Sequence, residues 1–155
     1  MAMASIRTPI GTVQVDSDGG AVTSVRWGLK GAAIMDAPSD PVLVEAIDQL
    51  DAYFAQRLDV FSLPLSIAGS EFQRRVCEAM QNIPHGETRT YGDLAQICEA
   101  PAQAIGAACG GNPIPVIIPC HRVLGANGLG GYSGAGGIET KVWLLRHEGA
   151  AGLLI

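Results

Sequence analysis

Strand patterns and helix patterns occupy separate parts of this chain. Residues 6–16 and 21–27 are rich in β-branched residues, and the turn signal Gly19-Gly20 lies between them, so they predict a β-hairpin. After Pro41 the apolar residues recur at helical spacing instead. A chain whose strands come first and whose helices follow is typical of an α+β fold. We therefore expect a small N-terminal β-sheet-plus-helix subdomain followed by a mostly helical subdomain.

The boundary between the two subdomains is expected in an extended segment. Asp40 followed by Pro41 predicts the start of a helix over residues 41–56. Residues 57–69 show no helical periodicity and end at a glycine, so they predict an extended linker. We therefore place the two subdomains at residues 1–69 and 70–155.

Four helices are expected in the second subdomain. The first begins where Ser70 and Gln73 match a capping box and ends at Pro84-His85-Gly86. The other three are predicted over residues 90–99, 102–109 and 138–148. Two short helices joined by a tight turn at Pro101 suggest a helix-turn-helix. The glycine-rich stretch 110–137 is expected to form loops.

Charge and composition exclude several classes of protein. The net charge of −5 argues against a chain that binds nucleic acid mainly by electrostatics, although residues 70–155 carry six basic against seven acidic residues. The longest apolar runs, such as 114–118, are too short to span a bilayer, and no secretion signal opens the chain. The four cysteines form no C-x-x-C pair and no zinc-ligand spacing. We therefore expect a cytoplasmic, monomeric protein with reduced thiols, no membrane contact and no metal.

One cysteine stands in a context that favours reactivity. The mostly apolar run 112–119 directly precedes Cys120, and His121 follows it. The thiolate is the nucleophilic form of cysteine, and an adjacent imidazole can take the thiol proton, directly or through a water. A buried structural cysteine beside a surface histidine is the alternative interpretation of these residues alone.

A longer pattern surrounds this cysteine and extends over most of the second subdomain. Its parts are Phe72-Gln73, Ile83-Pro84-x-Gly86-Glu87-Thr88, Tyr91-Gly92-Asp93-Leu94-Ala95, Gly106-Ala107, Asn112-Pro113, Pro119-Cys120-His121-Arg122-Val123, Gly131-Tyr132-Ser133, Gly136-Gly137, Lys141, Trp143-Leu144-Leu145 and His147-Glu148-Gly149. This pattern resembles the O6-alkylguanine-DNA alkyltransferases, densely over residues 70–150 and more loosely in the N-terminal part. Agreement of so many motifs in order and spacing is far more specific than a Cys-His pair.

The resemblance implies a role for each residue of a catalytic group. Cys120 would attack the alkyl carbon on O6 of guanine, while His121 would hold a water that accepts the thiol proton. Glu148 would orient His121, following the logic of nucleophile, base and orienting group. Asn112 would brace the turn before the nucleophile, and Tyr91 would donate a hydrogen bond to the guanine. The thioether formed is not hydrolysed, so each molecule would act once, without a cofactor.

The resemblance also implies double-stranded DNA containing O6-alkylguanine as the partner. The helix-turn-helix would bind the minor groove, and the damaged nucleotide would be flipped into a pocket, because the reacting carbon is otherwise buried in the base stack. Residues that would contact the DNA or the substrate are Tyr91, Gly92, Gln103, Gln73, Val123 and Ser133.

The chain departs from the family pattern at three places. Gln103 falls where the family has an arginine that enters the base stack, and the chain is two residues shorter just before it. Loss of that cation should weaken DNA affinity and its salt dependence, unless Gln103 is simply a surface residue. Two extra residues lie between Ser133 and Gly136, and Cys77 replaces a tryptophan common in the family.

Two other functions compete with alkyl transfer. Lesion binders of the same fold lack the nucleophile, and the presence of Cys120 counts against that alternative. A cysteine hydrolase or acyltransferase would use Cys120 and His121 with an oxyanion hole, for which Gly110-Gly111 could supply the N–H groups.

Overall fold

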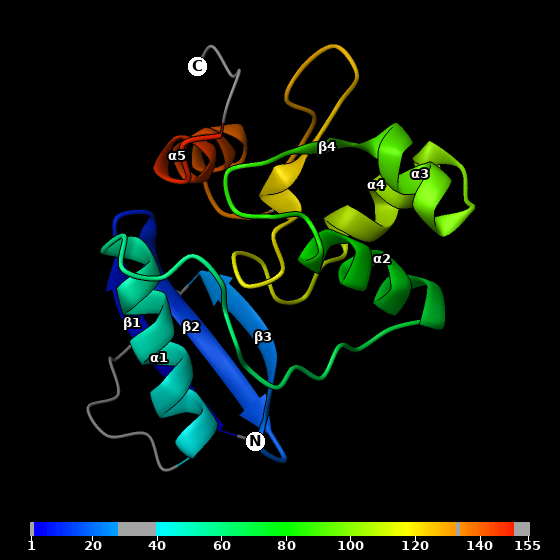
Figure 1. The fold of residues 1–155 in the computed structure, drawn as a ribbon. Coiled ribbons are helices and arrows are strands. Elements are labelled where there is room, and N and C mark those ends of the chain that lie inside the picture. Colours follow the sequence, from blue (N-terminus) through cyan, green and yellow to red (C-terminus); the bar gives the residue numbers. More distant parts are fainter. Residues whose placement is uncertain (1, 28–39, 133, 151–155) are drawn as a thin grey trace. The chain divides into compact units, whose positions relative to one another are not determined.

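The computed structural model describes residues 2–27, 40–132 and 134–150. Contacts divide the chain into two compact units, Met1–Ile67 and Ala68–Ile155 (Figure 1). The α+β class expected from the sequence is confirmed, with strands in the first unit and most helices in the second. No helix in the described parts of the chain is long and apolar enough to cross a membrane.

The first unit contains a three-stranded antiparallel sheet in the order β1-β2-β3. Its strands are β1 (Ala2–Thr8), β2 (Gly11–Asp18) and β3 (Ala21–Trp27). The single strand predicted over 6–16 is wrong, because Pro9 has no N–H to continue a ladder and the chain turns there. The predicted turn at Gly19-Gly20 is confirmed, with φ of +61° and +84°, which suits a two-residue hairpin of type I′.

Helix α1 (Pro41–Phe54) packs against this sheet, as Figure 1 shows in cyan and blue. The Asp40 side chain accepts a hydrogen bond from Val42 N at 3.1 Å, so the predicted N-cap is confirmed. The helix ends at Phe54, two residues before the predicted end at Gln56. Gln56 has a φ of +59°, which is not compatible with a continuing helix. Beyond it, Leu65 pairs with Val22 alongside β3, so part of the predicted linker joins the sheet.

The second unit is built on α2 (Glu71–Gln81), α3 (Tyr91–Cys98), α4 (Ala102–Gly110) and α5 (Ile138–His147). At the start of α3, Thr90 and Asp93 form both bonds of a capping box, at 3.0 and 2.8 Å. At the start of α2 only Ser70 caps, because the Gln73 side chain donates instead to Ala108 O at 2.7 Å. That bond ties α2 to α4.

Helices α3 and α4 pack against each other and are joined by residues 99–101. Glu99 ends α3 in the left-handed region, with φ +53°, and Pro101 then opens α4. The helix-turn-helix assignment of this pair stays a prediction.

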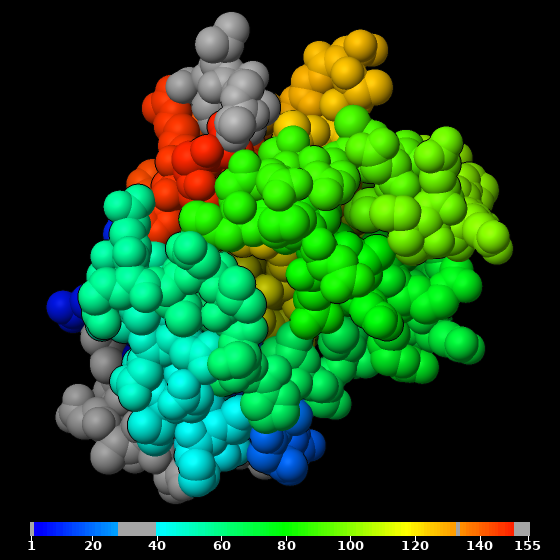
Figure 2. Space-filling view, in the orientation of Figure 1, coloured from blue at the N-terminus to red at the C-terminus, as the bar shows by residue number. Residues whose placement is uncertain are grey.

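The stretch expected to be loops contains two short elements. The 3-10 helix η1 (Cys120–Arg122) leads directly into β5 (Val123–Leu124). Strand β5 pairs in parallel with β4 (Arg89–Thr90), so that Arg89 faces Val123 and Thr90 faces Leu124. The apolar run before η1 is buried, and only a small part of it is visible in Figure 2. The reactive segment therefore lies inside the unit.

Candidate active site

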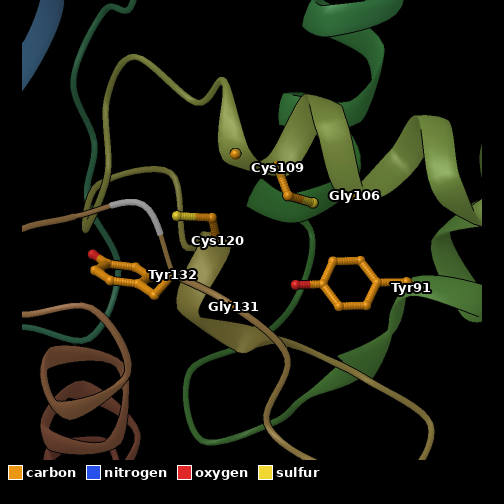
Figure 3. A pocket seen from close by; sticks show the side chains of 7 residues that line it. Tyr91, Gly106, Cys109, Cys120, Gly131 and Tyr132 are labelled. Carbon is orange, nitrogen blue, oxygen red and sulfur yellow. The ribbon is translucent and has the colours of Figure 1, made fainter.

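Cys120 lies at the first position of η1 and is 5% exposed. Its side chain lines a cavity of about 380 Å³ (Figure 3). Tyr91 enters this cavity from the start of α3, and Tyr132 from the segment after β5. The other lining residues are Gly106, Cys109, Gly110 and Gly131. A thiol with so little exposure can react only with a group that enters the cavity.

The Asn112 side chain braces the turn that presents Cys120. Its Nδ2 donates to Ile118 O at 2.9 Å, and its Oδ1 accepts from Ile114 N at 3.0 Å. The same turn holds Val116 at a φ of +71°, which is unfavourable for a β-branched residue. The structure thus brings Asn112 to the position that its predicted bracing role requires.

His121, Arg122 and Glu148 form a buried ionic cluster behind the nucleophile. His121 Nε2 lies 2.7 Å from Glu148 Oε2. The guanidinium of Arg122 donates to both oxygens of the same carboxylate, from Nε to Oε1 at 2.8 Å and from Nη2 to Oε2 at 2.9 Å. Its third bond, from Nη1 to Ile83 O at 2.7 Å, fixes the cluster to the loop after α2.

Helix α5 supplies Glu148 from its C-terminal end. Gly149 has a φ of +64° and donates to Arg146 O, while Ala150 N donates to Leu145 O. These bonds form a Schellman motif, which ends the helix at a defined residue. A carboxylate beside helix carbonyls is unfavourable, so the paired Arg122 cation is what makes the position tolerable.

The cluster sets the proton positions on His121. Burial lowers the pKa of His121, although hydrogen bonding to Glu148 opposes this, so the imidazole is neutral at neutral pH. Burial alone would raise the pKa of Glu148, but the bonds from His121 and Arg122 outweigh it and hold the pKa well below its usual range. With its proton on Nε2 toward the carboxylate, His121 carries a lone pair on Nδ1. That atom has no hydrogen-bond partner among the described residues.

For the Cys120 thiol to react as a thiolate, such a base is required. Burial raises its pKa, and the Asn112 amide and the Lys141 ammonium offset part of this effect. The thiolate is therefore a minor form at neutral pH until a base removes the proton.

Tyr91 and Lys141 shape the opposite side of the cavity. Burial raises the pKa of Tyr91, so its hydroxyl stays protonated and can donate a hydrogen bond. Lys141 is fully buried and donates to Val123 O at 2.6 Å and to Gly131 O at 2.9 Å. Its Nζ also lies 5.9 Å from the centroid of the Tyr91 ring. Lys141 thus holds the cavity wall together.

The remaining predicted residues are not gathered at the cavity. Gly92 and Gln103 are exposed, on α3 and in the first turn of α4. Gln73 is occupied in the bond from α2 to α4, and the carbonyl of Val123 is occupied by Lys141. Ser133 lies outside the described residues.

The oxyanion hole of the alternative hydrolase finds no support in the geometry. Gly111 N donates to Ala107 O at 3.0 Å and to Ala108 O at 3.1 Å, and Gly110 N belongs to α4. These N–H groups close the end of a helix and are not directed at a reacting carbonyl. Within the described residues, no group of three or more His, Cys, Asp or Glu side chains is arranged to hold a metal ion.

Two family profiles cover the chain in order. Residues 1–67 match the ribonuclease-like domain of 6-O-methylguanine DNA methyltransferase, and residues 71–150 match its DNA binding domain. The chain belongs to the 6-O-methylguanine DNA methyltransferase family. The resemblance inferred from the motifs is confirmed.

Some relatives match this chain over nearly their full length. A methylated-DNA–protein-cysteine methyltransferase of Mycobacterium leprae is 41% identical over 150 residues, covering 93% of this chain and 90% of the relative. One from Methanosarcina acetivorans is 40% identical, covering 97% and 99%. The crystal structure of Mycobacterium tuberculosis OGT in complex with DNA has a TM-score of 0.83 and 42% identity, covering 96% of this chain and 92% of that chain.

In this member of the 6-O-methylguanine DNA methyltransferase family, the structure places further residues at the site. The sequence alone assigned no role to them. Arg122 and Lys141 belong to the matched motifs, but no local pattern reveals that both charges are buried, with Arg122 paired to Glu148 and Lys141 bonded to two backbone carbonyls. Cys109 and Tyr132 line the cavity because α4 and the segment after β5 converge on Cys120. Only the tertiary arrangement identifies them.

Proposed function

We propose that this chain repairs DNA by transferring the alkyl group of O6-alkylguanine irreversibly to its own Cys120. One observation carries the proposal. A buried thiol lines a cavity of about 380 Å³, and a neutral imidazole held by a carboxylate follows it directly in the chain. The family membership and the names of the relatives support the same reaction.

The transfer is a displacement at the alkyl carbon. The Cys120 sulfur forms a bond to that carbon as the bond from the carbon to O6 breaks. The guanine keeps the electron pair of the broken bond. Tyr91, protonated and directed into the cavity, donates a hydrogen bond to the departing base and makes it a better leaving group.

The thiol proton passes to His121. Nδ1 carries the lone pair that accepts it through a water molecule, and Glu148 stabilises the imidazolium that results. Arg122 keeps Glu148 ionised throughout, because it pairs with both carboxylate oxygens. The product is a thioether, which no group of the site hydrolyses, so each molecule acts once and needs no cofactor.

DNA is the partner, and the buried nucleophile requires that the damaged base leave the stack. We assign binding and transfer to the C-terminal subdomain, residues 70–155, with residues 1–69 forming the separate α/β subdomain. The α3–α4 pair binds duplex DNA as a helix-turn-helix in the minor groove, with Gly92 and Gln103 on the DNA side and a monomer acting on each lesion. Val123 contributes to the substrate pocket through its backbone. Gln73 contributes to DNA binding through its hydrogen bond to Ala108 O on α4. Ser133 stays a predicted pocket residue.

Intact-mass analysis tests the proposal directly. The protein is incubated with a duplex that carries one O6-methylguanine, and with the unmodified duplex as control. A stable mass gain of one methyl group, located on the peptide that contains Cys120, is the expected result. Binding without a mass gain would instead support a lesion binder, and turnover of a model ester would support the hydrolase.

A further inference from the structure

Helix α2 donates a side-chain hydrogen bond to each helix of the α3–α4 pair. Gln73 donates to Ala108 O, near the end of α4, at 2.7 Å. Arg75 Nη2 donates to Cys98 O, at the last residue of α3, at 3.0 Å. Both acceptors lie toward the C-terminal ends of their helices. The pair is therefore held from α2 at two points, and the chemistry at Cys120 gives no reason for the one at Arg75.

The end of α3 is unfavourable without outside help. Glu99 ends the helix with a φ of +53°, in the left-handed region that residues other than glycine rarely adopt. Its carboxylate also lies at the C-terminal end of a helix, where the dipole disfavours negative charge. The last turn of α3 contains no basic residue. The cation that this helix end lacks comes from Arg75, which lines the same surface cavity of about 250 Å³ as Glu99.

The Arg75 guanidinium is held on its other side by α2 itself. Its carbon Cζ lies 5.6 Å from the centroid of the Phe72 ring, three residues earlier in the same helix. A planar guanidinium can stack on an aromatic face and donate from its edge at the same time. Although Arg75 is exposed, these two contacts define the position of its charged group at the end of α3.

The connection that follows α3 has little freedom. Only residues 99–101 lie between α3 and α4, and Pro101 has a fixed φ, here −63°. Helix α4 then begins at Ala102 without a side-chain cap. The first turn of α4, which carries the exposed Gln103, therefore takes its position from the end of α3. The opposite end of α4, which lines the cavity of the nucleophile, is held separately by Gln73.

We propose that Arg75 is a positioning residue for duplex DNA. By holding the end of α3 through Cys98 O, it places the first turn of α4 where the DNA binds, and it does not itself contact the DNA. This inference rests on the proposed function, which assigns DNA binding to the α3–α4 pair. Tyr91, at the other end of α3, is held by the Thr90 capping box, so the chemistry at Cys120 should not depend on Arg75.

The test separates DNA binding from alkyl transfer. Affinity for an unmodified duplex, which is bound without reaction, is measured by fluorescence anisotropy. Transfer from the free O6-methylguanine base is followed by intact mass. Arg75→Met keeps the apolar stem and removes the donor and the charge. Arg74→Met is the matched control, since Arg74 is also exposed on α2 and loses the same charge, but donates to Gly69 O ahead of the helix.

We expect Arg75→Met to weaken duplex binding by about 5-fold, the factor that corresponds to one ordinary hydrogen bond. The rate with the free base should stay at the wild-type value, and Arg74→Met should weaken binding less. The slope of log affinity against log salt should be the same for the two variants, because neither loses a phosphate contact. Arg75→Lys, which keeps a donor and the charge, should restore part of the affinity.

A second background tests whether Arg75 acts at the end of α3. Glu99→Gly removes the carboxylate and suits the left-handed conformation, so the helix end no longer needs a cation. Arg75→Met should then weaken duplex binding less than it does beside Glu99. Thermal unfolding checks that each variant is folded. Should Arg75→Met be unfolded, Arg75→Lys carries the same comparisons with a smaller expected loss.

Several results would overturn the inference. An equal loss of affinity in Arg74→Met, or a salt slope lower by about 0.9 in Arg75→Met alone, would show that Arg75 acts by charge or by a phosphate contact. Equal slowing with the free base would assign Arg75 to the fold of the cavity. Losses fully additive with Glu99→Gly would place its effect elsewhere. In each case wild type still binds and transfers, whereas a wild type that neither binds duplex nor accepts the methyl group would refute the proposed function.

Discussion

His121 Nε2 and Glu148 Oε2 lie 2.7 Å apart in a contact from which solvent is fully excluded. Since the carboxylate fixes the imidazole, the two side chains should act as one unit. We predict that His121→Gln or Glu148→Gln lowers the transfer rate at neutral pH by about 10²–10⁴-fold, the usual contribution of general-base catalysis. The double variant should cost little more than the worse single one. Losses that multiply fully in this double-mutant cycle would show that the residues act separately.

The same contact predicts how the free energy of unfolding depends on pH. The pKa of Glu148 is held below its usual range in the folded state, so its ionised form contributes stability that is complete above the unfolded-state pKa. This contribution is lost as pH falls from the ordinary range of a glutamate toward the depressed folded pKa. Urea unfolding from neutral to acidic pH should show a steeper loss for wild type than for Glu148→Gln. Parallel curves would contradict the assignment.

Glu148→Gln should also be less stable at neutral pH, by about 3–5 kcal/mol, because Arg122 would remain buried without a counter-charge. The rate comparison above therefore needs conditions in which each variant is folded. Circular dichroism on the same samples provides that control.

Replacing the nucleophile should separate binding from chemistry. We predict that Cys120→Ala abolishes alkyl transfer and retains affinity for a duplex with O6-methylguanine, measured by fluorescence anisotropy. Cys98→Ala is the matched control, since Cys98 is also buried but does not line the cavity. Transfer that persists in Cys120→Ala, with another thiol modified, would refute the assignment.

Lys141 should influence the rate through its charge. Burial lowers its pKa to about 8, although Cys120 and Cys109 oppose the shift, so the ammonium is present below that pH. In Lys141→Met the pKa of Cys120 should rise further, because one of the groups that lowers it is lost. The rate of wild type relative to the variant should be largest below pH of about 8 and approach a constant above it. A ratio that does not vary with pH would mean that Lys141 acts only by holding the carbonyls of Val123 and Gly131.

Gln103 should matter for duplex substrates alone. It is exposed on α4, a helix without any charged residue. If it fills the gap left by the flipped base, Gln103→Ala should slow repair of duplex DNA and spare the reaction with free O6-alkylguanine, which needs no flipping. Gln103→Arg should tighten DNA binding and steepen its salt dependence by roughly one phosphate, a slope change of about 0.9. Equal slowing on both substrates would indicate a role in the fold, and no slowing would indicate a surface residue.

Local signals predicted the starts of helices well. Asp40 and Thr90 cap α1 and α3 as expected, because a capping bond depends on residues only two or three positions away. The Gln73 half of the predicted capping box failed for the opposite reason. Its amide found the carbonyl of Ala108, a partner that exists only once α2 and α4 have packed.

The sequence could name the reactive group but not its environment. The motif around Cys120 predicted a nucleophile and its base, whereas the burial of Glu148 depends on a cation brought from another element. A glutamate at a helix end is ordinarily solvated, and nothing local predicts the two bonds from Arg122. The turn at Pro9 was missed because strand-like residues continue on both sides of it.

The two-residue ladder between β4 and β5 connects the segment that carries Tyr91 to the segment that carries Cys120. Tyr91 follows Thr90 directly, and Cys120 precedes Val123 by one turn of η1, so the pairing of these short strands fixes the spacing between Tyr91 and Cys120. The two predicted differences in length from the family pattern lie before Gln103 and after Ser133. Both lie outside the segments that contain Tyr91 and Cys120. The chain can therefore change in length outside these segments while the spacing between Tyr91 and Cys120 is kept.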